Sequence, residues 1–145
     1  EPKGTFHALS CAKPFLNDEP FLGLMADDFY KKEDLEILIR HPAAVLVYKT
    51  NFPERFGICK TNENNFLREI IEKPDYLCGN LASTGAFVLN EKIFEEPVIY
   101  GPNGEELLAP MIGALAKKQP IKVVKASFWF PIGYPEDLEK AAQFV

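Results

Sequence analysis

The sequence predicts an α/β fold built around a mixed β-sheet. Two short, continuous apolar runs, Phe21–Ala26 and Ala43–Tyr48, are typical of strands that are buried on both faces of a sheet. Segments with helical periodicity alternate with such runs along the chain. A hairpin in the middle of the chain adds antiparallel strands, so the sheet is expected to be mixed.

Composition and charge restrict the class of protein. The chain has 145 residues, of which 47% are hydrophobic and 26% are charged, which indicates one core and one domain over residues 1–145. The formal net charge of -5 argues against a nucleic-acid partner and against an anionic membrane surface, since both favour a basic face. A local basic spot for a phosphate remains compatible with this charge.

The cysteines indicate a reducing compartment. Cys11, Cys59 and Cys78 are odd in number and form no C-x-x-C pair, which favours neither a disulfide framework nor a zinc site. We therefore expect a cytoplasmic protein. No run reaches the length of a membrane span and no signal peptide is visible; because the chain opens at Glu1 without a methionine, we expect a further segment upstream.

Two helices are predicted in the first part of the chain. The first is indicated by apolar positions at spacings of three and four, namely Leu9, Ala12 and Leu16. The second, Lys31–Arg40, is amphipathic and its apolar side consists of Leu35, Leu38 and Ile39. Asp34 and Glu36 are expected on its solvated face.

The middle of the chain is predicted to form a β-hairpin. Phe56–Lys60 and Phe66–Ile71 are rich in aromatic and β-branched residues, and the turn-forming sequence TNENN separates them. Pro74 ends the second strand because it cannot donate a ladder hydrogen bond. Glu72 and Lys73 would point to opposite faces of a regular strand, so both can reach one ligand only if the chain bends there. Pro74 favours such a bend.

The last part of the chain supplies two strands and two helices. Ser83–Leu89 and Ile121–Ala126 are predicted to be strands. Glu105–Lys118 shows the helical pattern, with a buried stripe of Leu108, Met111, Ile112 and Leu115. The last helix is expected to open at Pro135, a first-turn position, and to bury Leu138, Ala141, Ala142 and Val145.

Charged residues follow several of the predicted strands. Asp27 and Asp28 follow the first apolar run, and Glu72 and Lys73 end the hairpin. Ligands of open α/β sheets bind beyond the carboxyl ends of the strands, so we expect these side chains to converge on one site. Asp28 is the weaker candidate as a ligand because adjacent strand residues point apart.

These residue types suit a ligand that carries a phosphate. Asp27 fits Mg2+, which takes one or two carboxylates and keeps waters or phosphate oxygens in its other positions. Lys73 fits a phosphate, and Glu72 fits sugar hydroxyls because an ionised carboxylate only accepts hydrogen bonds. Glycines that would let the backbone approach a ligand are Gly57, Gly79 and Gly85. On the residues alone, a solvated, charged strand end remains the alternative.

Six motifs occur in this order along the chain: PKGTFHAL, LMADDFY, PERFGICKTNENNFLREIIEKP, NLASTGAFVLNEKIFE, GEELLAPMI and FWFPIGYPEDLEKAAQFV. Together they resemble the sugar-1-phosphate nucleotidylyltransferases, of the kind that act on glucose 1-phosphate with UTP or dTTP, over essentially the whole chain. The resemblance implies a Rossmann-like (GT-A-like) three-layer α/β/α fold with a mixed sheet. It also implies two substrates, a sugar 1-phosphate and a nucleoside triphosphate, that react to an NDP-sugar and pyrophosphate.

The resemblance assigns roles to single residues. Asp27 matches the aspartate that binds the catalytic metal, Mg2+, and Lys73 matches the lysine on the phosphate of the sugar 1-phosphate. The residues matched to substrate binding are Gly4, Thr5, Gly57, Glu72, Thr84 and Gly85. Of these, Gly4 and Thr5 are implied to lie near the nucleotide, and the others near the sugar. The implied reaction is an in-line attack of the sugar-phosphate oxygen on the α-phosphorus, without a general base or a covalent intermediate.

The chain departs from the family pattern at two places. The glycine-rich loop that cradles the triphosphate does not occur in this sequence, so we interpret the chain as the C-terminal portion of a nucleotidylyltransferase domain that lacks its N-terminal portion. Pro131 stands where the family has a second metal carboxylate, and Pro110 where many relatives have an aspartate. An incomplete sheet exposes core surface, so pairing with another copy of the chain is also expected.

Two functions are therefore open. The first is part of an enzyme that makes an NDP-sugar and is inactive or weak as this fragment. The second is a non-catalytic module that binds a sugar phosphate or nucleotide, which Pro131 favours. Arg55 either reaches a phosphate or lies on the surface, and Trp129 is expected in the core or in a pocket wall.

Overall fold

The main sheet of the chain is mixed, as predicted. In the computed structural model, which describes residues 1–144, its strands follow the order β5 (Leu67–Glu72), β4 (Gly57–Thr61), β6 (Leu81–Leu89), β3 (Ala44–Lys49) and β7 (Lys122–Lys125), with β1 (Phe21–Gly23) also paired to β6. Only the β3–β7 pair is parallel among the described strands. A second, two-stranded sheet joins β2 (Phe29–Tyr30) to β8 (Trp129–Phe130).

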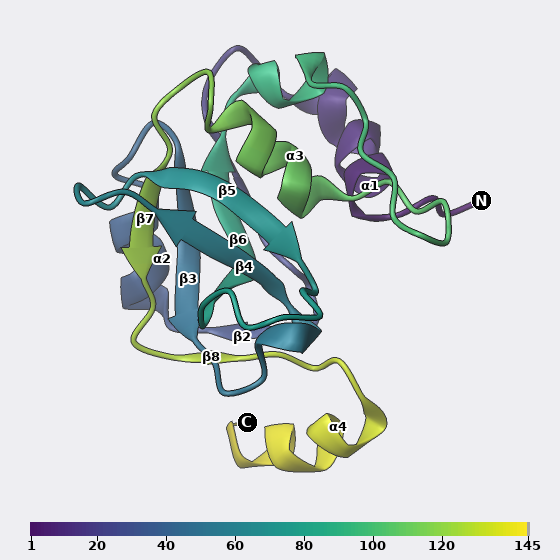
Figure 1. Cartoon of the computed structure of the whole chain (residues 1–145), viewed down its shortest axis with the longest axis vertical. Coiled ribbons are helices and arrows are strands. Elements are labelled where there is room, and N and C mark those ends of the chain that lie inside the picture. The colour runs from purple at the N-terminus through teal and green to yellow at the C-terminus, as the bar shows by residue number, and fades with distance from the viewer. Residues whose placement is uncertain (145) are drawn as a thin grey trace.

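Helices cover both faces of the main sheet, which gives the expected three layers (Figure 1). On one face lie α1 (Thr5–Ala12) and α3 (Leu108–Leu115), and on the other lies α2 (Lys32–Leu38). The predicted stripe of α3 is confirmed, because its members are at most 4% exposed: Leu108, Met111, Ile112 and Leu115. Residues 1–144 also contain four 3-10 turns: η1 (Lys13–Phe15), η2 (Pro53–Arg55), η3 (Glu91–Glu95) and η4 (Ala142–Phe144).

Strand β6 is the centre of the sheet. Val88 pairs with Ala44 of β3 on one edge and with Leu22 of β1 on the other. At its other end, Ala82 pairs with Tyr48 of β3 and with Ile58 of β4. Three strands that precede β6 in the sequence are thus held together through it.

The expected strand Phe21–Ala26 is shorter and less buried than predicted. Only Phe21–Gly23 forms a strand, and Leu22 is 42% exposed because β1 lies at an edge, with β6 as its one neighbour among the described strands. The ladder ends at Phe87, two residues after a left-handed backbone at Gly85 (φ 75°). Asp27 therefore lies in a turn and not directly at the end of a buried strand.

Two helices of the first part differ from the prediction at their ends. Leu9 and Ala12 lie in α1, but Pro14 belongs to η1, so Leu16 follows the helix. In α2, Leu38 is fully buried, whereas Ile39 is 55% exposed beyond the end of the helix.

The prediction that Asp34 of α2 lies on a solvated face is wrong. Asp34 is buried, and its Oδ2 accepts hydrogen bonds from the backbone N–H of Ser127 at 2.8 Å and of Phe128 at 3.2 Å. The Ser127 hydroxyl donates to the same oxygen at 3.0 Å. Its partners lie more than 90 residues away along the chain, which is why helical periodicity gave no sign of them.

The last helix, α4 (Pro135–Ala141), begins at Pro135 as predicted but does not bury the expected stripe. Ala141 is buried, whereas Leu138 is 59% exposed and Ala142 is exposed; Val145 lies outside the described residues. The reason is that α4 lies beside the body of the protein and not on the sheet (Figure 1). The end of the chain is held by the Phe144 ring, which packs 5.1 to 6.1 Å from the rings of Phe29, Phe128 and Phe130.

Among residues 1–144, no helix is both long and apolar enough to cross a membrane.

Helix α3 lies so close to β5 that its middle accepts only glycine. A Cβ atom added at Gly113 would lie 2.6 Å from the backbone nitrogen of Ile70. We predict that Gly113→Ala lowers the free energy of unfolding by about 1–3 kcal/mol, because the helix would have to move off the strand. Chemical denaturation measures this. Gly133→Ala is the control, since the nearest atom to an added Cβ there is Arg55 Nη2 at 3.8 Å. Equal effects of both changes would contradict the prediction.

Candidate functional site

A cavity of about 340 Å3 lies where the predicted site residues meet. Seven of the eight predicted residues line it: Thr5, Asp27, Gly57, Glu72, Lys73, Thr84 and Gly85. Gly4 does not line it, because its left-handed backbone (φ 122°) packs against Glu106, where an added Cβ would lie 2.6 Å from the carbonyl oxygen. The expected convergence of the charged strand ends on one site is therefore what the structure shows.

The bend predicted at the end of the hairpin is present at Lys73. This residue has a left-handed backbone (φ 38°), which is rare for a residue with a side chain. Its N–H donates to the carbonyl oxygen of Phe56 at 3.1 Å, and the following Pro74 is buried. Because the chain turns at this point, Glu72 and Lys73 line the same cavity instead of facing opposite sides of the sheet.

Gly57 leaves the space that the Glu72 carboxylate occupies. The two residues are paired across the hairpin, and a Cβ at Gly57 would lie 3.1 Å from Glu72 Oε2 and 2.9 Å from Ile70 Cγ2. Burial raises the pKa of Glu72; the ammonium of Lys73 lowers it in part, and the carboxylate of Glu105 adds to the rise. The Glu72 carboxylate is thus partly desolvated, and hydrogen-bond donors such as sugar hydroxyls would replace the lost water.

The two adjacent aspartates have different environments. Asp28 Oδ2 accepts from the indole Nε1–H of Trp129 at 2.8 Å, and Oδ1 accepts from the backbone N–H of Ile132 at 3.2 Å. Burial raises the pKa of Asp28, while these hydrogen bonds lower it. Asp27 is exposed and lines the cavity, and its carboxylate makes no hydrogen bond or ion pair within residues 1–144.

One wall of the cavity is a segment held by three carboxylates. We call residues 127–134 the strap; it crosses beneath the sheet and leads to α4 (Figure 1). Asp34 holds its start, Asp28 its middle, and Asp137 its end, where Asp137 Oδ2 accepts from the N–H groups of Gly133 at 3.2 Å and Tyr134 at 3.1 Å.

Trp129 of the strap forms part of this wall. It is 6% exposed, and its ring lies 5.0 Å from that of Phe56. The prediction of a core or pocket-wall aromatic is confirmed. Sequence reasoning missed that Asp28 and Asp34 hold the strap, because their partners lie more than 90 residues away in the sequence. Asp137 binds N–H groups only three and four residues before it, and an acidic residue in the first turn of the predicted last helix was the signal that could have indicated this cap.

The hydroxyls of the two threonines in the cavity are already used within the protein. Thr5 Oγ1 accepts from the N–H of Leu108 at 3.0 Å, so it caps the start of α3. Thr84 Oγ1 donates to the carbonyl oxygen of Leu46 at 3.0 Å. At Gly85, an added Cβ would lie 2.4 Å from Met25 Cγ, so this glycine lets the turn before Asp27 pack against β6.

The exposed carboxylate of Asp27, which makes no hydrogen bond within the described residues, suits a magnesium ion better than a metal that needs several protein ligands. Within the described part of the chain, no group of three or more His, Cys, Asp or Glu side chains could hold a metal ion. Mg2+ is commonly held by one or two carboxylates together with waters and phosphate oxygens. Asp27 can supply one such ligand, whereas the oxygens of Asp28 are used by Trp129 and Ile132.

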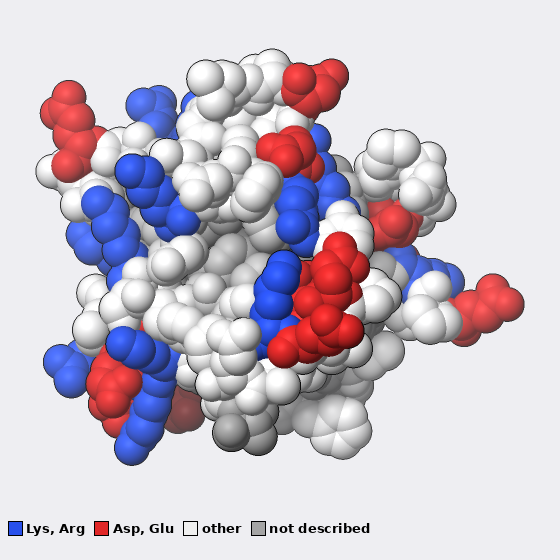
Figure 2. Space-filling view, turned by 90° about the horizontal axis from the view of Figure 1, so that it is seen from below, with Lys and Arg blue, Asp and Glu red and all other residues white. Residues whose placement is uncertain are grey.

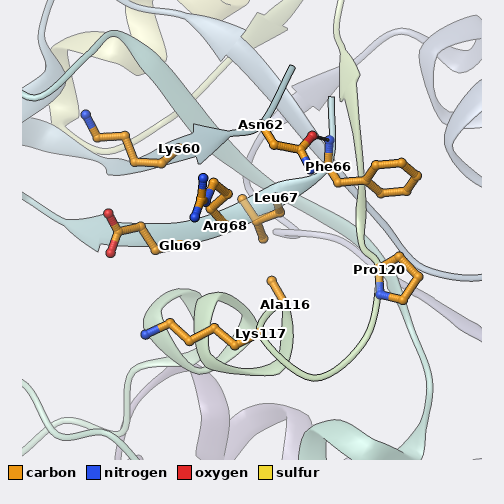
Figure 3. A pocket seen from close by; sticks show the side chains of 9 residues that line it. All are labelled: Lys60, Asn62, Phe66, Leu67, Arg68, Glu69, Ala116, Lys117 and Pro120. Atoms are coloured by element: carbon orange, nitrogen blue, oxygen red, sulfur yellow. Dashed lines mark hydrogen bonds between the residues drawn. The ribbon is translucent and has the colours of Figure 1, made fainter. Parts of the chain in front are cut away.

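A larger hollow, of about 910 Å3, lies outside this site, between the hairpin and the end of α3 (Figure 3). In Figure 3, Lys60, Glu69 and Lys117 extend along one side of it, with Phe66 and Pro120 on the other. None of the eight predicted site residues lines this hollow.

The whole chain is similar to a known protein family. The family model described as nucleotidyl transferase matches residues 1–145. This chain belongs to that family. It is 32% identical over 148 residues to the bifunctional protein GlmU of Methanocaldococcus jannaschii, with 100% of this chain and 36% of the relative covered. It is 30% identical over 154 residues to the UTP–glucose-1-phosphate uridylyltransferase AglF of Haloferax volcanii, with 99% of this chain and 63% of the relative covered. The chain thus spans between about one third and two thirds of the length of these relatives.

Solved structures share the fold. A UDP-glucose pyrophosphorylase complexed with UDP-glucose superposes with a TM-score of 0.87 at 21% identity, and covers 99% of this chain and 62% of its own. A glucose-1-phosphate thymidylyltransferase described as putative, from Bacillus anthracis in complex with a sucrose, gives 0.82 at 21% identity, over 99% of this chain and 61% of its own. The expected nucleotidyltransferase fold is therefore confirmed.

Asp27 and Asp28 form a matched pair for testing the wall of the cavity. We predict that Asp28→Ala lowers the free energy of unfolding by about 1–3 kcal/mol, because the indole N–H of Trp129 loses its acceptor. Asp27→Ala should change it by no more than about 0.5 kcal/mol, because its carboxylate bonds to nothing in the described chain. Trp129 is the one tryptophan of the sequence, so its fluorescence reports unfolding directly. A larger loss for Asp27→Ala would contradict this assignment.

Glu72→Gln tests the cost of the buried carboxylate. Because burial raises the folded-state pKa of Glu72, the wild-type chain is stabilised at acidic pH and loses this stability as the pH rises through that pKa. Glutamine does not titrate, so we expect Glu72→Gln to have the higher Tm at neutral pH, by a margin that shrinks in acid. Thermal unfolding across this pH range measures it, with Glu69→Gln as the control on the exposed side of β5. A lower Tm at neutral pH would show that Glu72 stabilises the fold.

Proposed function

We propose that this chain provides the sugar-phosphate side of a site that joins a sugar 1-phosphate to a nucleoside triphosphate and releases pyrophosphate. The family membership of the chain supports this proposal. Two relatives carry names of this kind, a UTP–glucose-1-phosphate uridylyltransferase and a mannose-1-phosphate guanylyltransferase subunit. Since the chain spans only part of such relatives, the complete reaction is proposed for the protein that contains it.

The observation that carries the proposal is the joint position of Asp27, Glu72 and Lys73 in one cavity. A sugar 1-phosphate has hydroxyls that donate and a phosphate that is anionic, and the cavity presents a carboxylate and an ammonium on consecutive residues. The bend at Lys73 is what allows both side chains to reach one ligand. A solvated strand end would not need this rare backbone conformation.

The proposed roles follow from the environment of each group. Glu72, whose carboxylate is partly desolvated, would accept hydrogen bonds from the sugar hydroxyls. Lys73 would contact the phosphate, and its positive charge would offset part of the phosphate's negative charge. Asp27 would hold Mg2+, which when bound neutralises phosphate oxygens as a Lewis acid. The buried wall formed by Trp129 would exclude water from the sugar face.

A non-catalytic binding module is the second candidate, and one observation favours it. The wall of the cavity contains Pro131 at the position where the family resemblance implies a carboxylate. A proline side chain has no oxygen to offer to a metal. Such a module would bind the sugar phosphate at the same residues but would not turn it over.

Titration calorimetry with glucose 1-phosphate and mannose 1-phosphate tests the shared part of both candidates. We predict that Lys73→Ala weakens binding by roughly 10- to 100-fold, because a charge-assisted hydrogen bond to the phosphate is lost. Lys117→Ala is the matched control, since this exposed lysine lines the other hollow. Equal affinities of wild type and Lys73→Ala would show that the phosphate does not bind at this end of the cavity.

Pyrophosphate release separates the two candidates. If the first candidate is right, the protein that contains this chain should release pyrophosphate when it is given UTP, Mg2+ and a sugar 1-phosphate. Binding without release, with each of UTP, ATP, GTP and dTTP, would instead favour the module.

A further inference from the structure

Arg55 has the position and the unused donors of a phosphate ligand. We infer that Arg55 is a second cation of this site and binds a phosphate group of the ligand together with Lys73. This inference rests on the proposed function and deepens it, because it names a further residue that recognises the ligand. The sequence left two readings of Arg55 open, a phosphate contact and a surface residue.

The charge of the cavity requires more than one cation. Its wall carries four carboxylates, Asp27, Asp28, Glu72 and Glu105. Among the described residues that line it, the cationic side chains are those of Lys73 and Arg55. A phosphate that met only Lys73 would enter a site with a clear excess of negative charge. With Lys73 alone the four carboxylates leave an excess of three negative charges, and Arg55 lowers this excess to two when it faces the same ligand.

The backbone brings the two cations to one place. Arg55 ends η2 and is followed by Phe56, whose carbonyl oxygen accepts the N–H of Lys73 at 3.1 Å. Gly57, the next residue, pairs with Glu72. Both cations therefore lie at the open end of the β4–β5 hairpin, on either side of a single backbone hydrogen bond.

Packing fixes the guanidinium of Arg55. Its Cζ lies 4.3 Å from the centre of the Tyr134 ring and 5.8 Å from that of Phe56. An added Cβ at Gly133, which also lines the cavity, would lie 3.8 Å from Arg55 Nη2. The side chain is 32% exposed, so it is held against the strap and still open to a ligand.

The neighbouring carboxylate does not use up the donors of Arg55. Asp137 Oδ2 lies 3.8 Å from Arg55 Nη2, which is too far for a hydrogen bond. That oxygen already accepts from the N–H groups of Gly133 and Tyr134, and Oδ1 lies 3.9 Å from the ammonium of Lys140. Within residues 1–144 the guanidinium makes no hydrogen bond, although it has five N–H donors in a planar fork that matches a phosphate.

Arg55 and Lys140 form a natural pair for a test. Both lie close to Asp137, at 3.8 and 3.9 Å, but only Arg55 lines the cavity. On the face that carries the strap and α4, seen from below in Figure 2, basic and acidic side chains lie next to one another. Removing either cation therefore changes the surroundings of the Asp137 carboxylate, but only the removal of Arg55 should change the affinity for the ligand.

The experiment measures binding of glucose 1-phosphate, mannose 1-phosphate and inorganic pyrophosphate to the wild type, Arg55→Gln, Arg55→Lys and Lys140→Gln by calorimetry at several salt concentrations. We expect Arg55→Gln to weaken a phosphate ligand by roughly 10- to 100-fold and to reduce the salt dependence of its Kd. Arg55→Lys should bind more tightly than Arg55→Gln but less tightly than the wild type, because lysine keeps the positive charge and lacks the planar set of guanidinium donors. Lys140→Gln should bind as the wild type does.

The outcomes separate this inference from the proposed function. Loss of sugar 1-phosphate binding supports the inference, because it places Arg55 on the phosphate that Lys73 contacts. Loss of pyrophosphate binding alone would place Arg55 on the phosphates of the nucleotide and would overturn the shared contact with Lys73. If Lys73→Ala weakens binding and Arg55→Gln does not, the inference is wrong and the proposed function stands. A weaker affinity with an unchanged salt dependence, or an equal loss in Lys140→Gln, would show that Arg55 only supports the strap. If the wild type binds none of these ligands, both fail.

Discussion

The left-handed backbone at Lys73 is the constraint on which the site depends. A non-glycine residue in this conformation costs about 1–2 kcal/mol, so its surroundings must hold it there. They do so from both sides, through the hydrogen bond to Phe56, the buried ring of Pro74 and the pairing of Glu72 with Gly57. Without this bend, the acid and the base would face opposite sides of the sheet, and the cavity would hold only one of them.

The opposite wall depends on long-range hydrogen bonds instead of backbone strain. The strap has little regular structure of its own, yet Asp34, Asp28 and Asp137 hold it at its start, middle and end. Each of these carboxylates accepts backbone N–H groups that a strand or helix would otherwise have satisfied. The site thus combines one wall that is set locally, by the hairpin, with one that is set mainly by Asp34 and Asp28, which are distant from the strap in the sequence.

This division explains what the sequence could predict. The hairpin, the buried stripe of α3 and the convergence of Asp27, Glu72 and Lys73 follow from local patterns and from the position of strand ends, and the structure agrees. The short β1 and the exposed stripe of α4 were not predictable, because they depend on which neighbours each element has. The use of Asp34 to hold the strap depends on a partner more than 90 residues away, which periodicity cannot reveal.

The central position of β6 has a consequence for synthesis of the chain. β1, β3 and β4 all emerge before β6, and each finds a neighbour in β6. Until residue 89 has left the ribosome, β1 has no partner and β3, whose first four residues are buried in the finished fold, has both edges open. Only the β4–β5 hairpin can close earlier, so it is the natural first structure on the nascent chain. The bend that carries Glu72 and Lys73 could then form before the sheet that surrounds it.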